Sequence, residues 1–150
     1  MDTAIPSTPV EHSQKKSLAR HLPTVARVLL GLVFFVFGLN GFLEFIPQPK
    51  LDPADPAFAF GMAMKATGYL FGLVKGTEVV AGALFLLNRF VPLALALIAP
   101  VIVNIFLFHA FLAPSGVGLA VVLLALEIYL AWSYRAVYRP MLGMKVSAGA

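Results

Sequence analysis

Hydrophobic residues along this chain gather in four long runs, which are separated by short segments rich in proline, glycine and charged residues. The runs cover about residues 24–45, 68–87, 90–112 and 117–134. A helix of about 20 residues, rising 1.5 Å per residue, crosses the hydrocarbon core of a bilayer. With short turns between the later runs, the pattern predicts an all-α membrane protein, an antiparallel bundle of four transmembrane helices.

The segments between and beyond the runs complete the expected organisation. After the first run the chain is rich in proline, and then becomes apolar again over a stretch too short to cross a bilayer. We expect this outer loop to carry a short interfacial, or partly re-entrant, helix over the mouth of the bundle. The expected parts are a flexible cytoplasmic tail at 1–22, a transmembrane domain at 23–138 with its outer loop at 46–67, and a second cytoplasmic tail at 139–150.

The basic residues are placed as in a membrane protein. All but Lys50, Lys65 and Lys75 lie in the two tails, in the turn at 88–89, at the start of the first run or directly after the last run. Such an excess is typical of cytoplasmic segments, so both termini are expected in the cytoplasm, with Arg27 extending to the headgroups. The net charge is +4, but no basic patch lies on a soluble face, so no nucleic-acid partner is expected.

Composition excludes several kinds of chemistry. Apolar residues make up 60% of the chain and charged residues only 12%, so the chain is not an ordinary soluble domain. Cysteine is absent, so no disulfide, thiol nucleophile or Cys-ligated metal is expected. A bis-histidine haem needs two histidines in the membrane, where only His109 lies, and the GxSxG, Walker and GxGxxG patterns are absent.

Six polar residues within the apolar runs are the candidate ligand-binding residues: Glu78, Lys75, Asn104, Glu127, His109 and Asn40. Counted from the expected outer boundaries, five of them lie roughly 9–15 Å deep, and His109 lies nearer the mouth. Charged groups at that depth are costly in contact with lipid. We therefore expect one polar layer inside the bundle, to which all four helices contribute.

Two pairings within this layer are open. Lys75 can neutralise Glu78, three residues along the same helix, or reach Glu127 across the bundle. One lysine cannot pair fully with two carboxylates, so we expect one carboxyl to be neutral near pH 7. The same residues also suit interhelical hydrogen bonding, and His109 suits either a proton or redox role or contact with headgroups.

Small residues indicate where helices approach one another. The first helix carries a stripe of three glycines: Gly31, Gly38 and Gly41. Gly72 and Gly76 form a second small-residue pair in the next run. Pro23 fits the start of the first span, where a missing N–H costs nothing.

Short tracts in the first three spans resemble the DoxX family. They are Gly38-Leu39-Asn40-Gly41 after Arg27 and Gly31, then Thr77-Glu78-Val79-Val80-Ala81-Gly82, and Ala99-Pro100 through Asn104 to Phe108-His109. The resemblance extends over about residues 24–135 and implies a four-helix protein of the prokaryotic inner membrane. The family positions it implies are Arg27, Gly31, Gly38, Glu78, Gly82, Asn104 and His109.

The resemblance also implies a link to redox metabolism. The founding association of the family is with a thiosulfate:quinone oxidoreductase and terminal-oxidase assembly in an archaeon, and some bacterial relatives are implicated in oxidative-stress complexes. We expect a redox-linked accessory protein that binds a quinone, or a similar apolar small molecule, in the outer half of the membrane. Any enzymatic activity would be that of an oxidoreductase subunit acting with a membrane or redox protein partner.

Two other classes of function fit the same residues. A non-enzymatic assembly or chaperone module would hold a partner's helix in the groove. A small-solute or proton permease would need a homo-oligomer, because four spans enclose only a narrow bundle.

Overall fold

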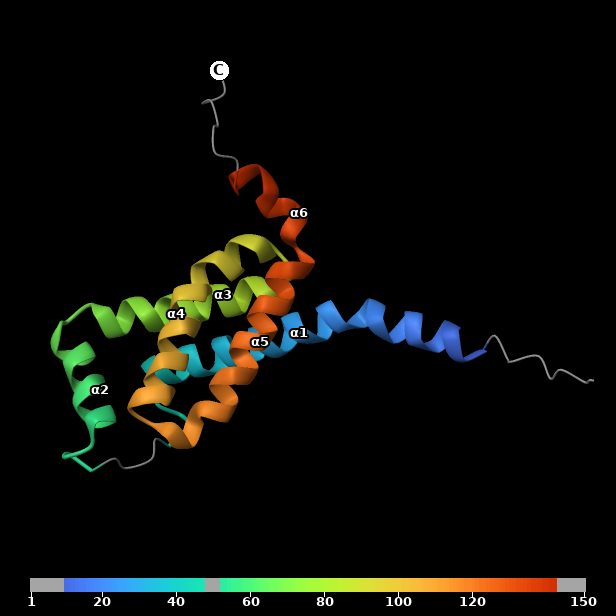
Figure 1. Ribbon diagram of the computed structural model, residues 1–150. Coiled ribbons are helices and arrows are strands. Elements are labelled where there is room, and N and C mark those ends of the chain that lie inside the picture. Colours follow the sequence, from blue (N-terminus) through green and yellow to red (C-terminus); the bar gives the residue numbers. More distant parts are fainter. Residues whose placement is uncertain (1–9, 48–51, 143–150) are drawn as a thin grey trace, which may run out of the picture.

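The computed structural model of the chain describes residues 10–47 and 52–142, with side chains from residue 21 to residue 141 (Figure 1). Its regular elements are all helices in these ranges. They are α1 (Val10–Leu43), α2 (Pro56–Ala66), α3 (Leu70–Leu86), α4 (Val91–Phe111), η1 (Pro114–Gly116), α5 (Val117–Ser133), α6 (Arg135–Tyr138) and η2 (Arg139–Leu142). The all-helical class predicted from the sequence is confirmed for this part of the chain.

The four long helices pack in a ring. α1 lies against α3 and α5, and α4 lies against the same two helices. Figure 1 shows α1 beside α3 and α4 beside α5, with the second pair running obliquely across the first. α2 turns aside at the start of α3, at an angle of 93°. The ring therefore consists of two crossed helix pairs.

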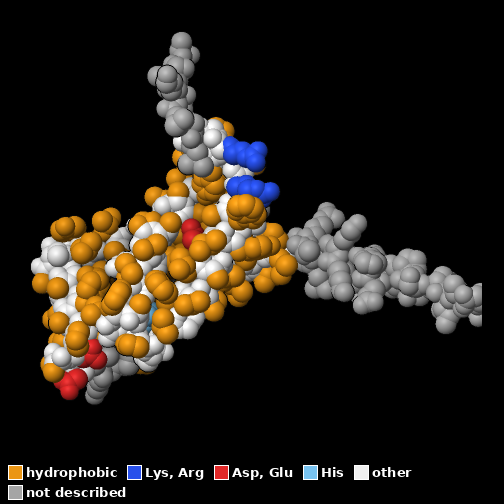
Figure 2. All heavy atoms as spheres, viewed as in Figure 1, with side chains coloured by type: hydrophobic (Ala, Val, Ile, Leu, Met, Phe, Trp, Pro, Cys, Tyr) orange, Lys and Arg blue, Asp and Glu red, His pale blue; other side chains and the backbone are white. Residues whose placement is uncertain are grey.

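Within the described residues, three helical segments are long and apolar enough to cross a membrane: His21–Leu43, Val91–Phe111 and Pro114–Ser133. α3 has 17 residues, and together with α2 it qualifies as a fourth, bent span. Figure 2 shows hydrophobic side chains covering this face of the helical body, with acidic side chains at the lower left end, a further acidic side chain in the upper middle, and Lys and Arg side chains at the upper right. An apolar outer surface of this kind is stable in lipid and unstable in water.

Glycines on α1 and α3 allow these two helices to approach closely. A Cβ added at Gly38 would lie 2.8 Å from the backbone nitrogen of Val79, and one added at Gly31 would lie 3.0 Å from the Leu86 side chain. A Cβ added at Gly82 would overlap the backbone of Phe35 on α1. The predicted close approach along the first helix is thus confirmed, and its partner is α3.

The second predicted glycine pair does not make such a contact. A Cβ at Gly72 or Gly76 would have nothing within 4 Å. The prediction that this pair packs against another helix is therefore wrong for the described chain.

Two expectations for the first helix are also corrected. α1 begins at Val10 rather than near residue 24, so Pro23 lies inside the helix and residues 10–22 of the expected tail are helical. Arg27 does not extend to the headgroups. It is buried, and its Nη1 donates a hydrogen bond to the carbonyl of Phe85, one of the last carbonyls of α3, which lack partners within that helix.

The glycine contacts give a test with a matched control. Replacement of Gly82 by Ala places a methyl group against the α1 backbone, so we expect the free energy of unfolding in detergent to fall by about 1–3 kcal/mol. Gly76→Ala meets open space, so its stability should stay the same or rise by up to about 1 kcal/mol through higher helix propensity. Equal stability of the two variants would contradict the packing described.

Candidate functional site

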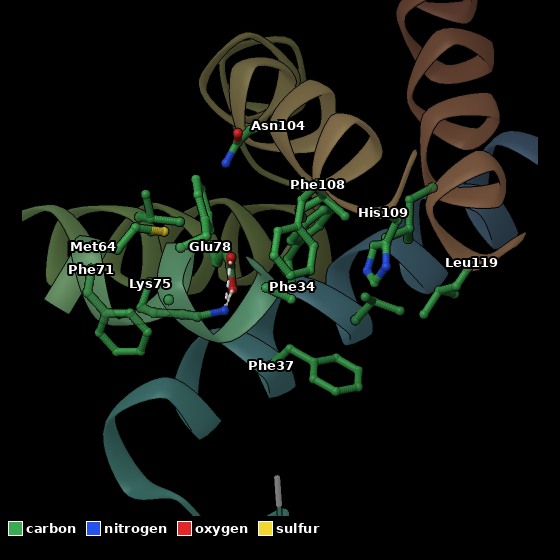
Figure 3. A pocket seen from close by; sticks show the side chains of 17 residues that line it. Phe34, Phe37, Met64, Phe71, Lys75, Glu78, Asn104, Phe108, His109 and Leu119 are labelled. Carbon is green, nitrogen blue, oxygen red and sulfur yellow. Dashed lines mark hydrogen bonds and ion pairs between the residues drawn. The ribbon is translucent and has the colours of Figure 1, made fainter. Parts of the chain in front are cut away.

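A cavity of about 460 Å³ lies within the ring, on the side covered by α2 (Figure 3). Side chains from all five of the helices α1 to α5 line it. Its walls are mainly apolar and include five phenylalanines: Phe34, Phe37, Phe60, Phe71 and Phe108. Its polar groups come from Lys75 and Glu78 on α3 and from Asn104 and His109 on α4.

Lys75 and Glu78 form an ion pair at the wall of this cavity. Lys75 Nζ lies 2.8 Å from Oε2 and 3.1 Å from Oε1 of Glu78. The Glu78 side chain is 4% exposed and that of Lys75 is 23% exposed, so the ammonium group is the more accessible partner. Of the two pairings left open by the sequence, the structure has the one within α3.

The position of this pair depends on the glycine stripe of α1. A Cβ at Gly38 would lie 3.0 Å from Cβ of Glu78, and a Cβ at Gly41 would lie 2.5 Å from Cγ of Lys75. The aliphatic part of Lys75 therefore crosses α1 where that helix has no side chain. This path directs the ammonium group back towards the carboxylate of Glu78.

Asn104 and His109 lie on opposite sides of the cavity. Figure 3 shows Asn104 on the same side as Met64, and His109 close to Leu119. Asn104 is exposed although it lines the cavity, so its amide lies at an opening. His109 is half-buried, and its Nδ1 lies 3.0 Å from the carbonyl oxygen of Ala113, just beyond the end of α4.

Gly116 provides the space for the His109 ring. A Cβ at this position would overlap Cε1 and Nδ1 of His109. The short η1 turn thus packs directly under the imidazole. This contact fixes the ring at the cavity wall and keeps it from extending outward.

Asn40 lies outside the cavity and has a structural role. It is buried, its Oδ1 accepts a hydrogen bond from the backbone N–H of Ile46 at 2.6 Å, and its Nδ2 donates to the Ile46 carbonyl at 3.3 Å. These bonds satisfy backbone groups of the turn that follows α1. The prediction that Asn40 lies in one polar layer with Glu78 therefore differs from the structure, in which Asn40 bonds to the turn after α1.

Glu127 also lies apart from the cavity. It is buried among the core residues that α5 contributes, one helical turn from both Leu123 and Leu130, and its Oε2 has no hydrogen-bond partner among the described residues. Tyr138 lies near Glu127, and its hydroxyl donates a hydrogen bond to the Pro92 carbonyl at 2.6 Å. Burial of the Tyr138 hydroxyl raises its pKa, and the negative charge of Glu127 raises it further. The residues of the expected polar layer therefore lie in three separate places: the cavity, the turn after α1 that Asn40 holds, and the core around Glu127.

Sequence reasoning missed the contribution of α2. Ala57, Phe60, Gly61 and Met64 all line the cavity, and the rings of Phe60 and Phe108 lie with centroids 5.5 Å apart. Their spacing of 0, 3, 4 and 7 residues is the pattern of one apolar helix face, so the sequence contains the signal. The sequence analysis expected a short helix over the mouth of the bundle, but did not expect its side chains to line the cavity.

The cavity can hold an apolar molecule and make a few directed polar contacts. It offers an ammonium donor, an amide that both donates and accepts, an imidazole and a carboxylate. In the described part of the chain, no group of three or more His, Asp or Glu side chains is placed to hold a metal ion. The arrangement resembles small-molecule sites in general, which combine apolar walls with a small number of placed polar groups.

Fold and surface together define a multi-pass helical membrane protein with an internal cavity. A family model for DoxX matches residues 22–110, which is more than half of the chain, so the protein belongs to the DoxX family. The resemblance seen in the sequence is thereby confirmed. Comparisons with curated proteins and with solved structures found no match.

The ion pair predicts a strong coupling between two substitutions. Lys75→Met leaves the carboxylate of Glu78 buried without a cation, so we expect a loss of about 2–4 kcal/mol in the free energy of unfolding. Glu78→Gln added to Lys75→Met removes that charge and should recover more than half of the loss. Unfolding in detergent measures both, and additive effects would contradict the pairing.

A second substitution tests the packing under His109. Gly116→Ala forces the imidazole to move and breaks its contact with Ala113, so the NMR signals of ¹³C,¹⁵N-labelled His109 should shift. Gly118→Ala is the matched control, because its methyl group meets nothing within 4 Å. The same His109 spectrum in both variants would show that the ring does not pack on Gly116.

Proposed function

We propose that this DoxX-family protein is a redox-linked accessory protein of the plasma membrane of a prokaryote, and that its cavity binds a quinone or a similar apolar small molecule. The observation that carries the proposal is the combination of aromatic walls with one partly exposed ammonium group, Lys75. A quinone ring is flat and apolar on both faces and has carbonyl oxygens at its edge. The cavity offers complementary groups to each of these features.

The aromatic side chains fit the ring and the first part of an isoprenoid tail. Phenylalanine rings pack favourably against a flat π-system in offset or edge-to-face contact. The volume of about 460 Å³ falls within the range of about 300–1,000 Å³ that is usual for small-molecule sites. A headgroup of one substituted ring fits inside, and the tail would continue into the lipid.

The polar groups fit the two carbonyl oxygens. Lys75 Nζ keeps one N–H donor free beyond its two bonds to Glu78, and the Asn104 amide adds donors on another side of the cavity. The Nδ1–H of a neutral His109 ring donates to the Ala113 carbonyl, which leaves Nε2 as an acceptor. A hydrogen bond from a charged donor contributes about 1.5–3 kcal/mol. Glu78 holds the ammonium group in position, and the pair can donate a proton to a quinone oxygen when the partner supplies the electrons.

The orientation that accompanies this function puts both termini in the cytoplasm. Arg135 and Arg139 follow α5 in the sequence, whereas Asp52 and Asp55 precede α2, and Figure 1 shows α2 and α6 at different ends of the helical body. Basic segments are retained on the cytoplasmic side. α2 then lies at the outer interface, α3 counts as the fourth span, and the cavity belongs to the outer half of the membrane.

A redox protein partner supplies the electrons in this proposal. The chain itself would bind and orient the quinone beside that partner. The same cavity also suits an assembly module that holds a partner's helix, and crosslinking that recovers one dominant membrane partner without any bound quinone would favour that alternative.

Binding of short-chain ubiquinone or menaquinone to the purified protein tests the proposal. We expect saturable binding, weakened at least about tenfold by Lys75→Met, because a charged hydrogen bond to the ligand is lost. Lys65→Met is the matched control: Lys65 lies over the Phe71 ring, 5.2 Å from its centroid, but does not line the cavity, so its removal should leave the affinity unchanged. The absence of binding to the folded wild-type protein would overturn the proposal, and so would equal affinity of the Lys75→Met variant.

A further inference from the structure

We propose that α2 is a lid, which turns about Thr67 and Gly68 and opens the cavity sideways to the lipid between α3 and α4. The lid itself is inferred from the contacts of α2. The identity of the molecule that it admits rests on the proposed function, which makes that molecule a lipid-dissolved quinone.

α2 is the least embedded of the helices that line the cavity. Among its 11 residues only Ala57 is buried, and its packing on the ring is mainly with α3. Its aromatic contact with α4 is the pair formed by Phe60 and Phe108. Elements with few buried contacts open locally at much lower free energy than the core, so α2 can move while the ring stays folded.

The connection between α2 and α3 is built as a corner. The Thr67 hydroxyl donates to the carbonyl of Met64 at 2.7 Å and accepts from the backbone N–H of Leu70 at 3.0 Å, so it joins the end of one helix to the start of the next. Gly68 has φ of +78°, a conformation that other residues rarely adopt, and nothing lies within 4 Å of its missing Cβ. A glycine at this corner gives the backbone the conformational freedom that a hinge needs.

The cavity already reaches the surface next to this lid. Asn104 lines the cavity and is exposed, and its neighbours Val103 and Leu107 are exposed on the same helix. Figure 3 shows Asn104 and Met64 on one side of the cavity, away from His109. Movement of α2 away from Phe108 would widen this opening. A ring could then enter between α3 and α4 while its tail stays in the bilayer.

The absence of cysteine from the chain allows a direct distance measurement. Spin labels at Met62→Cys on α2 and Leu107→Cys on α4, both exposed positions, report on the lid. Labels at Leu73→Cys on α3 and Leu107→Cys form the reference pair within the ring. In bilayers without quinone, we expect two distances for the lid pair and one narrow distance for the reference pair.

Removal of the aromatic contact should shift this equilibrium. Phe60→Ala should raise the population at the longer distance about two- to tenfold, as expected for the loss of one aromatic pair, while the reference pair stays unchanged. Phe111→Ala is the matched control, because Phe111 is on α4 and exposed but does not line the cavity. A single narrow distance for the lid pair, unchanged by Phe60→Ala, would show that α2 is not a lid.

Distance measurements with added ubiquinone distinguish failure of the lid from failure of the proposed function. Addition of short-chain ubiquinone should deplete the longer distance, and Phe60→Ala should speed ubiquinone release. If two lid distances occur but ubiquinone neither binds nor changes them, the lid stands and the proposed ligand is wrong. If ubiquinone binds while the lid pair shows one fixed distance, the ligand stands and the lid is wrong.

Discussion

The close packing of α1 against α3 is the contact on which the rest of the molecule depends. Gly38 and Gly82 bring the two backbones within a distance that no larger residue would allow. Helices in a bilayer gain little from the hydrophobic effect when they associate, so such surface-to-surface contact supplies much of the binding energy between them. The same approach brings Arg27 of α1 to the carbonyl of Phe85 at the end of α3.

This packing also creates the site. Gly41 leaves room for the aliphatic part of Lys75, which can then turn back to Glu78, and the pair reaches the cavity as a unit. A lysine and a glutamate within a membrane helix are costly when they face lipid. Here the cost is limited because each charge has its partner and because the accessible side is the cavity. The crossed pair of α4 and α5 closes the ring, and α2 covers it.

The helices and four of the six candidate residues could be predicted from the sequence, for a physical reason. Charged and amide side chains within an apolar run are distinctive, so Lys75 and Glu78 stand out. The phenylalanines of the cavity wall do not stand out in the sequence, because phenylalanine is equally common on a lipid-facing surface. The prediction that Glu127 shares a layer with Glu78 rested on equal depth along each helix, and it assumed that all helices run parallel to one another. α5 crosses obliquely instead, and Glu127 lies in the apolar core. Helix rotation and crossing angle come from tertiary packing, which the apolar pattern of one helix does not contain.

Photoaffinity labelling with an azidoquinone, in native membranes, tests the central claim most directly. If the ring binds between the aromatic walls and the Lys75–Glu78 pair, label will be found in peptides that contain residues 56–78 and 104–109, and excess ubiquinone will compete it away. Label that is spread over the lipid-facing residues of α5, and that ubiquinone does not displace, would contradict the account.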